Sequence, residues 1–225
     1  MIINGIDINS YNLILTKAPA VTKPQKRVRQ IVIPGRSGSL TEWSGDYEQY
    51  VKESEFIYTG NDINAALNFL RSATLAVFPN DTDYAYEVRV DEKINAVREP
   101  SGIHKITAVF TAQPLKKLAT PTVSSGSTSY SITNPGNEIA YPKIVVTGAG
   151  NKTVTIGAQT ITLAFAVGGE TLTIDSLNGQ VYDASGNNAW TKLTGNLPFI
   201  PVSSSAITVS TTGSALTVYH NWRWS

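Results

Sequence analysis

Most of this 225-residue chain consists of short runs rich in Val, Ile, Thr and Tyr, which end at Gly, Pro, Asn or Asp. Such runs are typical of β-strands, because branched and aromatic side chains pack well on a pleated sheet and the flanking residues accept the dihedral angles of tight turns. No run approaches the roughly 20 apolar residues that span a bilayer, so we expect no membrane insertion. The sequence therefore predicts a mainly β protein.

The first half carries seven predicted strands, the first two joined by a turn at residues 9–10. One of them alternates clearly: Lys52 and Phe56 share one face, whereas Glu53 and Glu55 occupy the other, which we expect to face solvent. The seven segments are Ile2–Ile8, Tyr11–Thr16, Val28–Ile33, Tyr50–Tyr58, Ala73–Phe78, Tyr84–Val97 and Ile103–Ala112.

Helical spacing appears at one place. Ile63, Ala66 and Leu70 recur at positions i, i+3 and i+7, which places them on one stripe of a helix. The Asn-Asp pair at 61–62 precedes them and can cap the helix through a side-chain oxygen. We therefore predict one helix over residues 62–72.

The second half carries nine predicted strands, with turn residues about every 8–12 positions, which is typical of a β-sandwich or jelly roll. The Asn178-Gly179 pair between apolar runs predicts a hairpin with a type I′ turn, because both residues accept positive φ. The nine segments are Ser129–Thr133, Ala140–Thr147, Thr153–Ile156, Gln159–Ala166, Thr171–Asp175, Gln180–Asp183, Ala189–Leu193, Ala206–Ser210 and Ala215–Trp224.

Charge separates the two halves. Residues 1–118 hold 14 of the 18 Lys and Arg residues and 13 of the 17 Asp and Glu residues. The composition changes at a stretch rich in Ser and Thr without an apolar period, which is typical of a linker. We therefore predict an N-terminal β-sandwich-like domain with one helix at 1–118, a linker at 119–137 and a C-terminal β-sandwich at 138–225.

Residues suited to catalysis are few. The absence of cysteine excludes disulfides, thiolate metal sites and cysteine nucleophiles. The two histidines, His104 and His220, fall in different predicted domains, and no Gly-x-Ser-x-Gly elbow accompanies them. The segment Pro34–Ser39 lacks the Gly-Lys-Ser ending of a phosphate-binding loop, so a tight turn with an exposed Arg36 is the favoured interpretation.

The second half offers four carboxylates: Glu138, Glu170, Asp175 and Asp183. Asp175 and Asp183 lie at the two ends of the predicted hairpin, where facing carboxylates would suit a glycosidase and Asp175 a Ca²⁺ site. No oxygen-rich loop accompanies Asp175, so turn stabilisation is the favoured interpretation. We predict no enzyme activity, no metal site and no cofactor.

Two surface features allow alternative interpretations. Lys23, Lys26, Arg27 and Arg29 form either a solvated loop or a contact to a partner or to passing DNA, although the net charge of +1 indicates no general attraction to nucleic acid. In a strand, Trp222 and Trp224 would share one face. Together with Trp190 they would form part of a sandwich core or a sugar-stacking surface.

Several short motifs follow one another along the chain. They are Ile3-Asn-Gly-Ile-Asp7, Ile33-Pro-Gly-Arg-Ser-Gly-Ser-Leu40 followed by Trp43 and Tyr47, the helix at 63–70 with the strand at 75–78, Tyr141-Pro-Lys-Ile144, Leu172-Thr-Ile-Asp175, Asn178-Gly-Gln-Val-Tyr182 and Trp222-Arg-Trp224. In this order they resemble the siphophage distal tail (Dit) proteins over nearly the whole chain.

The resemblance implies a structural protein of the phage tail tip. Proteins of this family form a hexameric ring from their N-terminal domains, and their galectin-like C-terminal domains project outward. The ring joins the tail tube protein to tail-tip or tail-associated proteins and leaves a channel through which DNA passes without sequence-specific binding. A receptor-binding protein is a further expected partner. The protein is expected to assemble in the host cytoplasm and to end in the virion.

Ring contacts require protruding loops and exposed strand edges rather than a reactive site. The 21–30 segment, a 41–50 loop and Arg36 have the composition of such exposed contacts. The candidate ring-interface residues are Lys26, Arg27, Arg29, Arg36, Trp43 and Tyr47. The alternative function is a carbohydrate-binding adhesion module in host recognition, with Trp190, Trp222 and Trp224 as sugar contacts.

Overall fold

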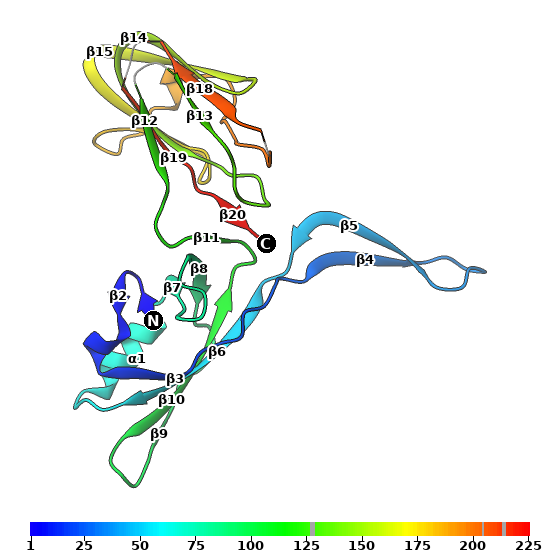
Figure 1. Cartoon of the computed structure of the whole chain (residues 1–225), viewed down its shortest axis with the longest axis vertical. Helices are drawn as coiled ribbons and strands as arrows, with labels where there is room; N and C mark the ends of the chain where they lie inside the picture. The colour runs from blue at the N-terminus through cyan, green and yellow to red at the C-terminus, as the bar shows by residue number, and fades with distance from the viewer. Residues whose placement is uncertain (127–128, 204, 213–214) are drawn as a thin grey trace. The chain divides into compact units, whose positions relative to one another are not determined.

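The computed structural model describes residues 1–126, 129–203, 205–212 and 215–225. Antiparallel strands predominate, with one α-helix in the described part of the chain, so the predicted mainly β fold class is confirmed. The chain divides into two compact units, Met1–Ala119 with Ser225, and Thr120–Trp224 (Figure 1). None of the described helices is long and apolar enough to cross a membrane.

Unit 1, residues 1–119, contains strands and helices that alternate with short turns. They are β1 (Ile2–Ile3), β2 (Ile6–Asp7), the 3-10 helix η1 (Ile8–Tyr11), β3 (Leu13–Lys17), β4 (Lys26–Val32), β5 (Ser39–Tyr47), β6 (Tyr50–Tyr58), α1 (Ile63–Arg71), β7 (Leu75–Val77), β8 (Tyr84–Arg89), β9 (Asn95–Arg98), β10 (His104–Ala112) and β11 (Lys116–Leu118).

The main sheet of unit 1 has the strand order β2-β1-β7-β8-β10-β6-β3, with β9 paired to β10 and β11 to β8. Strand β6 pairs with β10 over nine residues. The predicted faces of β6 are confirmed, because Lys52 and Phe56 are buried and Glu53 is exposed. Strands β4 and β5 form a separate two-stranded hairpin.

Helix α1 closes one side of the unit 1 core. Asp62 caps it, since its Oδ1 accepts a hydrogen bond from the Ala65 N–H at 3.1 Å. The apolar stripe buries Ala66 and Phe69, and the ring of Tyr11 stacks on Phe69 with centroids 4.0 Å apart. The predicted helix is therefore confirmed.

The start of the chain differs from the prediction. Residues 2–8 form two short strands rather than one, because Asn4 and Gly5 take positive φ values of 51° and 81° and reverse the chain. The Asn4 Oδ1 accepts hydrogen bonds from the N–H groups of Thr74 and Leu75, each at 3.0 Å. These partners are about 70 residues away in the sequence, so local propensity does not reveal the turn.

Three further segments of unit 1 need correction. The turn expected at residues 9–10 is the 3-10 helix η1. The strand expected over 84–97 is split into β8 and β9, which pair with different parts of β10. The loop expected at 41–50 belongs mainly to β5, because β4 supplies a hydrogen-bonding partner along its length.

A polar cluster is buried beside β6. The Lys52 Nζ donates to the Ala20 carbonyl at 3.1 Å and lies 4.4 Å from the centroid of the Tyr86 ring. Asp81 accepts hydrogen bonds from the Tyr86 hydroxyl and from the Lys116 Nζ, the latter at 2.8 Å. The Asp81 carboxylate thus interacts electrostatically with both Lys52 and Lys116, and both lysines are largely shielded from water.

The protonation of this cluster follows from burial and pairing. Burial lowers the pKa of Lys52, and the charge of Asp81 opposes that shift. Burial alone would raise the pKa of Asp81, but the hydrogen bonds from Lys116 and Tyr86 and the charges of the two lysines bring it below its usual range. Burial, with the bond to Asp81, raises the pKa of Tyr86.

Unit 2, residues 120–224, is almost entirely β. Its elements are β12 (Val123–Gly126), β13 (Ser129–Ile132), β14 (Lys143–Ile156), β15 (Gln159–Asp175), β16 (Gln180–Asp183), the 3-10 helix η2 (Trp190–Lys192), β17 (Leu193–Thr194), β18 (Ile207–Thr211), β19 (Ala215–Tyr219) and β20 (Arg223–Trp224). The strand order is β12-β19-β14-β15-β16, with β18 on β14, β13 on β18 and β17 on β15.

One long hairpin, β14–β15, organises unit 2. Its register shifts between Gly148 and Gly150, where residues 166–169 leave the ladder. Strands β19 and β16 flank the hairpin on one side of the shift, and β18 and β17 flank it on the other. Bulged strands of this kind turn the corner between the sheets of a sandwich. Both parts of β14 contribute to the core, through Ile144, Val146, Val154 and Ile156.

The strands predicted for the long hairpin of unit 2 were too short, and the predicted linker was too long. Residues 140–156 and 159–175, expected as four strands, form mainly the two long strands β14 and β15. The stretch 119–137, expected as a linker with a strand at 129–133, contains that strand as β13 and a further strand, β12, and they pair with β18 and β19. Ser and Thr fill these strands because cross-strand partners satisfy their backbone. Residues 127–128 of that stretch lie outside the described residues.

The predicted hairpin at 178–179 forms with a different turn. Asp175 pairs with Gln180, which leaves a four-residue loop, and only Gly179 of its Asn-Gly pair has positive φ (64°). The Asp175 carboxylate accepts hydrogen bonds from the Asn178 N–H at 3.1 Å and its side-chain amide at 2.8 Å. This Asp side chain stabilises the wider loop, so the turn is not type I′.

Two other segments of unit 2 are not continuous strands. The strand expected over 189–193 is mostly the 3-10 helix η2. The strand expected over 215–224 ends at Tyr219, since Asn221 takes a positive φ of 51° before β20. Consequently Trp222 lies outside a strand, and its ring packs on His220 at 4.6 Å between centroids.

His220 is an unusual core residue. It is 3 % exposed, and neither ring nitrogen has a hydrogen-bond partner among the described residues. Burial lowers its pKa, because an imidazolium ion would lose its hydration there. The buried imidazole therefore favours the neutral form.

Asp81→Asn should destabilise unit 1 by about 3 kcal/mol at pH 7, because it leaves buried lysines without their counter-ion. The folded pKa of Asp81 is depressed, so its contribution is present above about pH 4 and is lost as the pH falls further. Urea unfolding at pH 7 and pH 3 should show the difference from wild type shrinking in acid. Asp91→Asn, at an exposed ion pair with Arg89, is the control and should cost under about 1 kcal/mol. An equal cost for both variants would contradict this role.

His220→Phe should raise the stability of unit 2 by about 1 kcal/mol, because it keeps a ring and removes unpaired polar atoms. The folded pKa of His220 is depressed, so the unfolded state binds the extra proton and wild-type stability falls as the pH drops below about 6.5. Thermal unfolding at pH 7 and pH 5 should show that the variant loses this slope. His104→Phe should retain it, because His220 remains, and an unchanged slope in His220→Phe would refute the assignment.

Candidate interaction surface

The hairpin of β4 and β5, residues 26–47, is called here the arm. Figure 1 shows it as a long blue ribbon that leaves the sheet of unit 1. Its ladder runs from Lys26 opposite Tyr47 to Val32 opposite Ser39. At the tip, the Arg36 N–H donates to the Ile33 carbonyl at 3.1 Å.

The base of the arm is ordered by aromatic and ionic contacts. The Lys26 Nζ lies 4.0 Å from the centroid of the Trp43 ring, and Trp43 meets Tyr47 edge to face at 5.7 Å. The Trp43 Nε1 donates to the Asp46 carbonyl at 2.9 Å, and the Arg27 Nη1 donates to the Asp46 carboxylate at 3.0 Å. These contacts hold the two strands of the arm together at its base.

All the predicted ring-interface residues lie on the arm. The structure brings Lys26, Trp43 and Tyr47 together at the base, whereas Arg36 is at the tip. Arg29 lies between them, opposite Glu42. The full set is Lys26, Arg27 and Arg29 on β4, Arg36 in the tip loop, and Trp43 and Tyr47 on β5.

Sequence reasoning missed the aliphatic side chains of the arm. Val28 and Val32 share one face with the predicted Trp43, and the three are 42 %, 78 % and 43 % exposed. Leu40 is exposed on the other face, and Ile33 is exposed in the tip loop. Residues 28–33, which are rich in β-branched side chains, were predicted as an ordinary core strand. They differ from a core strand only in that both faces of the hairpin are exposed. An exposed apolar surface of this kind is typical of a protein interaction site.

The arm also has free strand edges. A two-stranded hairpin is at best marginally stable alone in water, and its outer N–H and C=O groups are available to another chain. Its charged side chains disfavour indiscriminate aggregation. The arm therefore has the physical properties of an element that completes its packing on a partner.

An open groove of about 550 Å³ lies where the arm meets the body of unit 1. Gln49 on its wall accepts a hydrogen bond from the Arg89 Nη2 at 3.0 Å. Its polar lining is better suited to binding a polar side chain of a partner protein than to catalysing a reaction. The lining residues are Arg27, Tyr47, Glu48, Gln49, Gln113 and Pro114.

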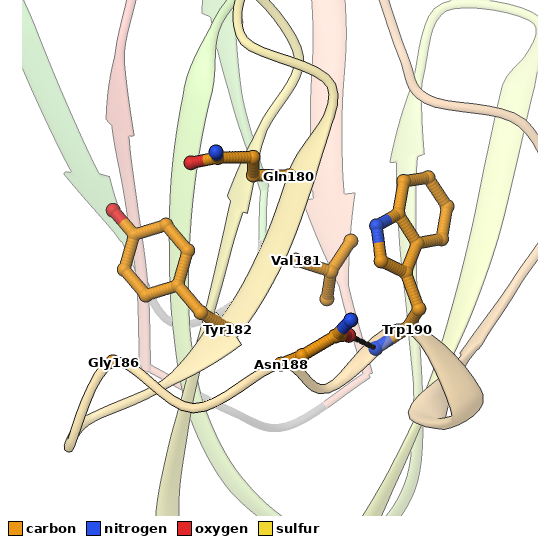
Figure 2. A pocket seen from close by; sticks show the side chains of 6 residues that line it. All are labelled: Gln180, Val181, Tyr182, Gly186, Asn188 and Trp190. Atoms are coloured by element: carbon orange, nitrogen blue, oxygen red, sulfur yellow. Dashed lines mark hydrogen bonds between the residues drawn. The ribbon is translucent and has the colours of Figure 1, made fainter.

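The predicted sugar contacts are not on one surface. Trp190 is 41 % exposed and lines a small pocket (Figure 2), whereas Trp222 is 4 % exposed in the core of unit 2. Burial removes Trp222 from any sugar-stacking face. Trp224 is partly buried on β20, after the bend at Asn221 that separates it from the preceding strand.

The carboxylates of unit 2 stabilise turns and ion pairs. Asp183 pairs with Leu172 and not with Asp175, so the two do not face each other. Asp183 accepts hydrogen bonds from the N–H groups of Ser185 and Asn187, each at 2.9 Å, and these bonds lower its pKa. Across the described residues, no three His, Asp or Glu side chains are placed to hold a metal.

These features define a class of fold: two mainly antiparallel β units, the first with one helix and a projecting arm. The chain matches the crystal structure of the Dit protein of phage SPP1, with a TM-score of 0.72 at 14 % sequence identity over 96 % of each chain. That protein is described as a paradigm of the hub adsorption apparatus in phages that infect Gram-positive bacteria. The chain therefore has the Dit fold. No protein-family model and no curated protein sequence matches it.

The arm should exchange its amide hydrogens much faster than the main sheet in the unassembled chain. Backbone N–H groups of β4 and β5 lack packing cover, so local opening costs little, whereas those of β6 and β10 lie in the core of the sheet. Hydrogen exchange read by mass spectrometry, at a dilution where the chain is monomeric, should differ by at least about 100-fold between the two hairpins. Equal protection would show that the arm needs no partner.

Proposed function

We propose that this chain is a structural protein of a phage tail tip, which assembles into a ring that joins the tail tube to tail-tip proteins. The observation that carries the proposal is the arm of unit 1, with its exposed apolar side chains and free edges, in a chain that has the Dit fold. The chemistry of the described residues suits contacts with other proteins rather than catalysis.

The arm accounts for how a ring would close. Head-to-tail contacts between identical copies form a closed ring when the rotation per copy divides a full turn. In the proposed assembly, the arm of each copy lies on unit 1 of the next and buries Val28 and Val32 there. Arg29 and Arg36 supply polar contacts at its rim. The resemblance to Dit proteins favours six copies and a central channel that passes DNA.

The charge balance fits this role. Unit 1 holds most of the charged residues of the chain in nearly equal numbers, and several are paired, as in the bridges of Lys17 with Glu53 and Glu55. A neutral surface with both signs favours specific contacts over general attraction to the passing DNA. The proposed partners are other copies of the chain, the tail tube protein and a tail-tip protein, with a receptor-binding protein as a further partner in the virion.

The test is the solution mass of the full chain, measured by size exclusion with multi-angle light scattering over a concentration series. Wild type should form a species of several protomers. Val32→Glu should raise the concentration needed for assembly at least about tenfold, because it places a charge in an apolar contact. Arg36→Asp should act in the same direction at the tip.

Val167→Glu provides the matched control, because Val167 is 66 % exposed in unit 2 and lies outside the arm. It should assemble as wild type does. A wild-type chain that stays monomeric throughout the series would contradict self-assembly through the arm. Normal assembly of Val32→Glu would remove the arm from the contact.

A further inference from the structure

A small pocket of about 190 Å³ lies beside β16, where residues 187–189 pair with that strand. Figure 2 shows the rings of Tyr182 and Trp190 on either side of Val181, with Asn188 between them. Val181 is 2 % exposed and forms an apolar floor. The lining residues are Gln180, Val181, Tyr182, Gly186, Asn188 and Trp190.

The walls of this pocket are held in place by their own backbone. The Ala189 N–H donates to the Val181 carbonyl at 2.9 Å, which ties the following residues to β16. The Trp190 N–H donates to the Asn188 Oδ1 at 3.0 Å and sets the start of η2. Asp183 fixes the loop 184–187 through the hydrogen bonds to its carboxylate. A pocket fixed in advance loses little conformational entropy when a ligand binds.

The pocket offers neutral chemistry. Among its described lining residues, none carries a charge. Nearby charged groups already have partners: Lys192 is paired with Glu170, and Lys143 has a raised pKa because it hydrogen-bonds Tyr182. What remains for a ligand is an exposed indole face and the side-chain amides of Gln180 and Asn188.

A flat aromatic face next to amide groups matches the two kinds of surface of a sugar ring. The C–H face of a pyranose packs on an aromatic ring, while its hydroxyl groups donate to and accept from amides. An anionic ligand would find no cation in the lining, and a wholly apolar one would leave both amides without partners.

We propose that this pocket binds a neutral sugar ring, stacked on Trp190 and hydrogen-bonded by Gln180 and Asn188. The binding site is independent of the arm and of ring formation, and it would give unit 2 a ligand of its own. Its shallow form limits the affinity for a single ring to a dissociation constant on the order of 1 mM.

The experiment is saturation-transfer NMR and calorimetry on the full chain with three neutral sugars: glucose, galactose and N-acetylglucosamine. Glycerol 3-phosphate serves as the anionic comparison. At least one neutral sugar should bind. Trp190→Ala should weaken that binding more than about tenfold, because it removes the stacking face. Gln180→Ala, an exposed position on β16, should weaken it several-fold without altering the fold.

Trp43→Ala is the matched control, because Trp43 is exposed to nearly the same extent as Trp190 but lies on the arm. It should bind the sugar as wild type does. Absence of binding to all three sugars, at sugar concentrations ten times the expected dissociation constant, would overturn the proposal. So would binding that survives Trp190→Ala, or binding of glycerol 3-phosphate in preference to the sugars. None of these outcomes bears on ring assembly, which is measured separately by mass.

Discussion

Backbone pairing between antiparallel strands is the constraint on which both units depend, since buried N–H and C=O groups must find partners. Unit 1 meets it with the β6–β10 ladder at the centre of its sheet, and unit 2 with the long β14–β15 hairpin. The bulge near Gly148 and Gly150 lets one hairpin serve two strand groups. The arm extends this pairing well beyond the core of unit 1, so the outer edges of its strands can pair with another chain.

The polar cluster of unit 1 links its core to the arm. Lys52 holds the Ala20 carbonyl, and the Asn80 side-chain amide donates to the Pro19 carbonyl at 2.6 Å. Both contacts act on the segment 18–25 that leads from β3 into β4. A buried lysine is costly unless it is compensated, and Asp81 supplies that compensation. The cluster therefore stabilises the position from which the arm starts, which an interaction element requires if it is to meet the same partner surface in every copy.

The sequence was sufficient to predict an element where apolar residues recur on one face of a strand or one stripe of a helix, as in β6 and α1. It failed where a distant partner decides the structure. Asn4 reverses the chain because its side chain accepts a hydrogen bond from the distant Thr74 N–H. The Asp175 carboxylate stabilises a wider hairpin loop than the two-residue turn that the Asn-Gly pair favours. The candidate residues of the arm were found from their charge and exposure-prone composition. The aliphatic ones were missed, because Val28 and its neighbours have the pattern of a core strand and only the three-dimensional structure shows that they are exposed.

The two most exposed tryptophans, Trp43 and Trp190, differ in how many contacts their indole rings already make within the protein. Trp43 is engaged by the Lys26 ammonium, by the edge of Tyr47 and by the hydrogen bond from its Nε1. Trp190 is held by its backbone N–H, and within the described residues its indole makes no comparable contact. An aromatic side chain whose backbone is held in place while the face of its ring is exposed is suited to stacking on a ligand. The arm of unit 1 and the pocket of unit 2 thus present different chemistry, one apolar and charged, the other aromatic and neutral, which suits them to different partners.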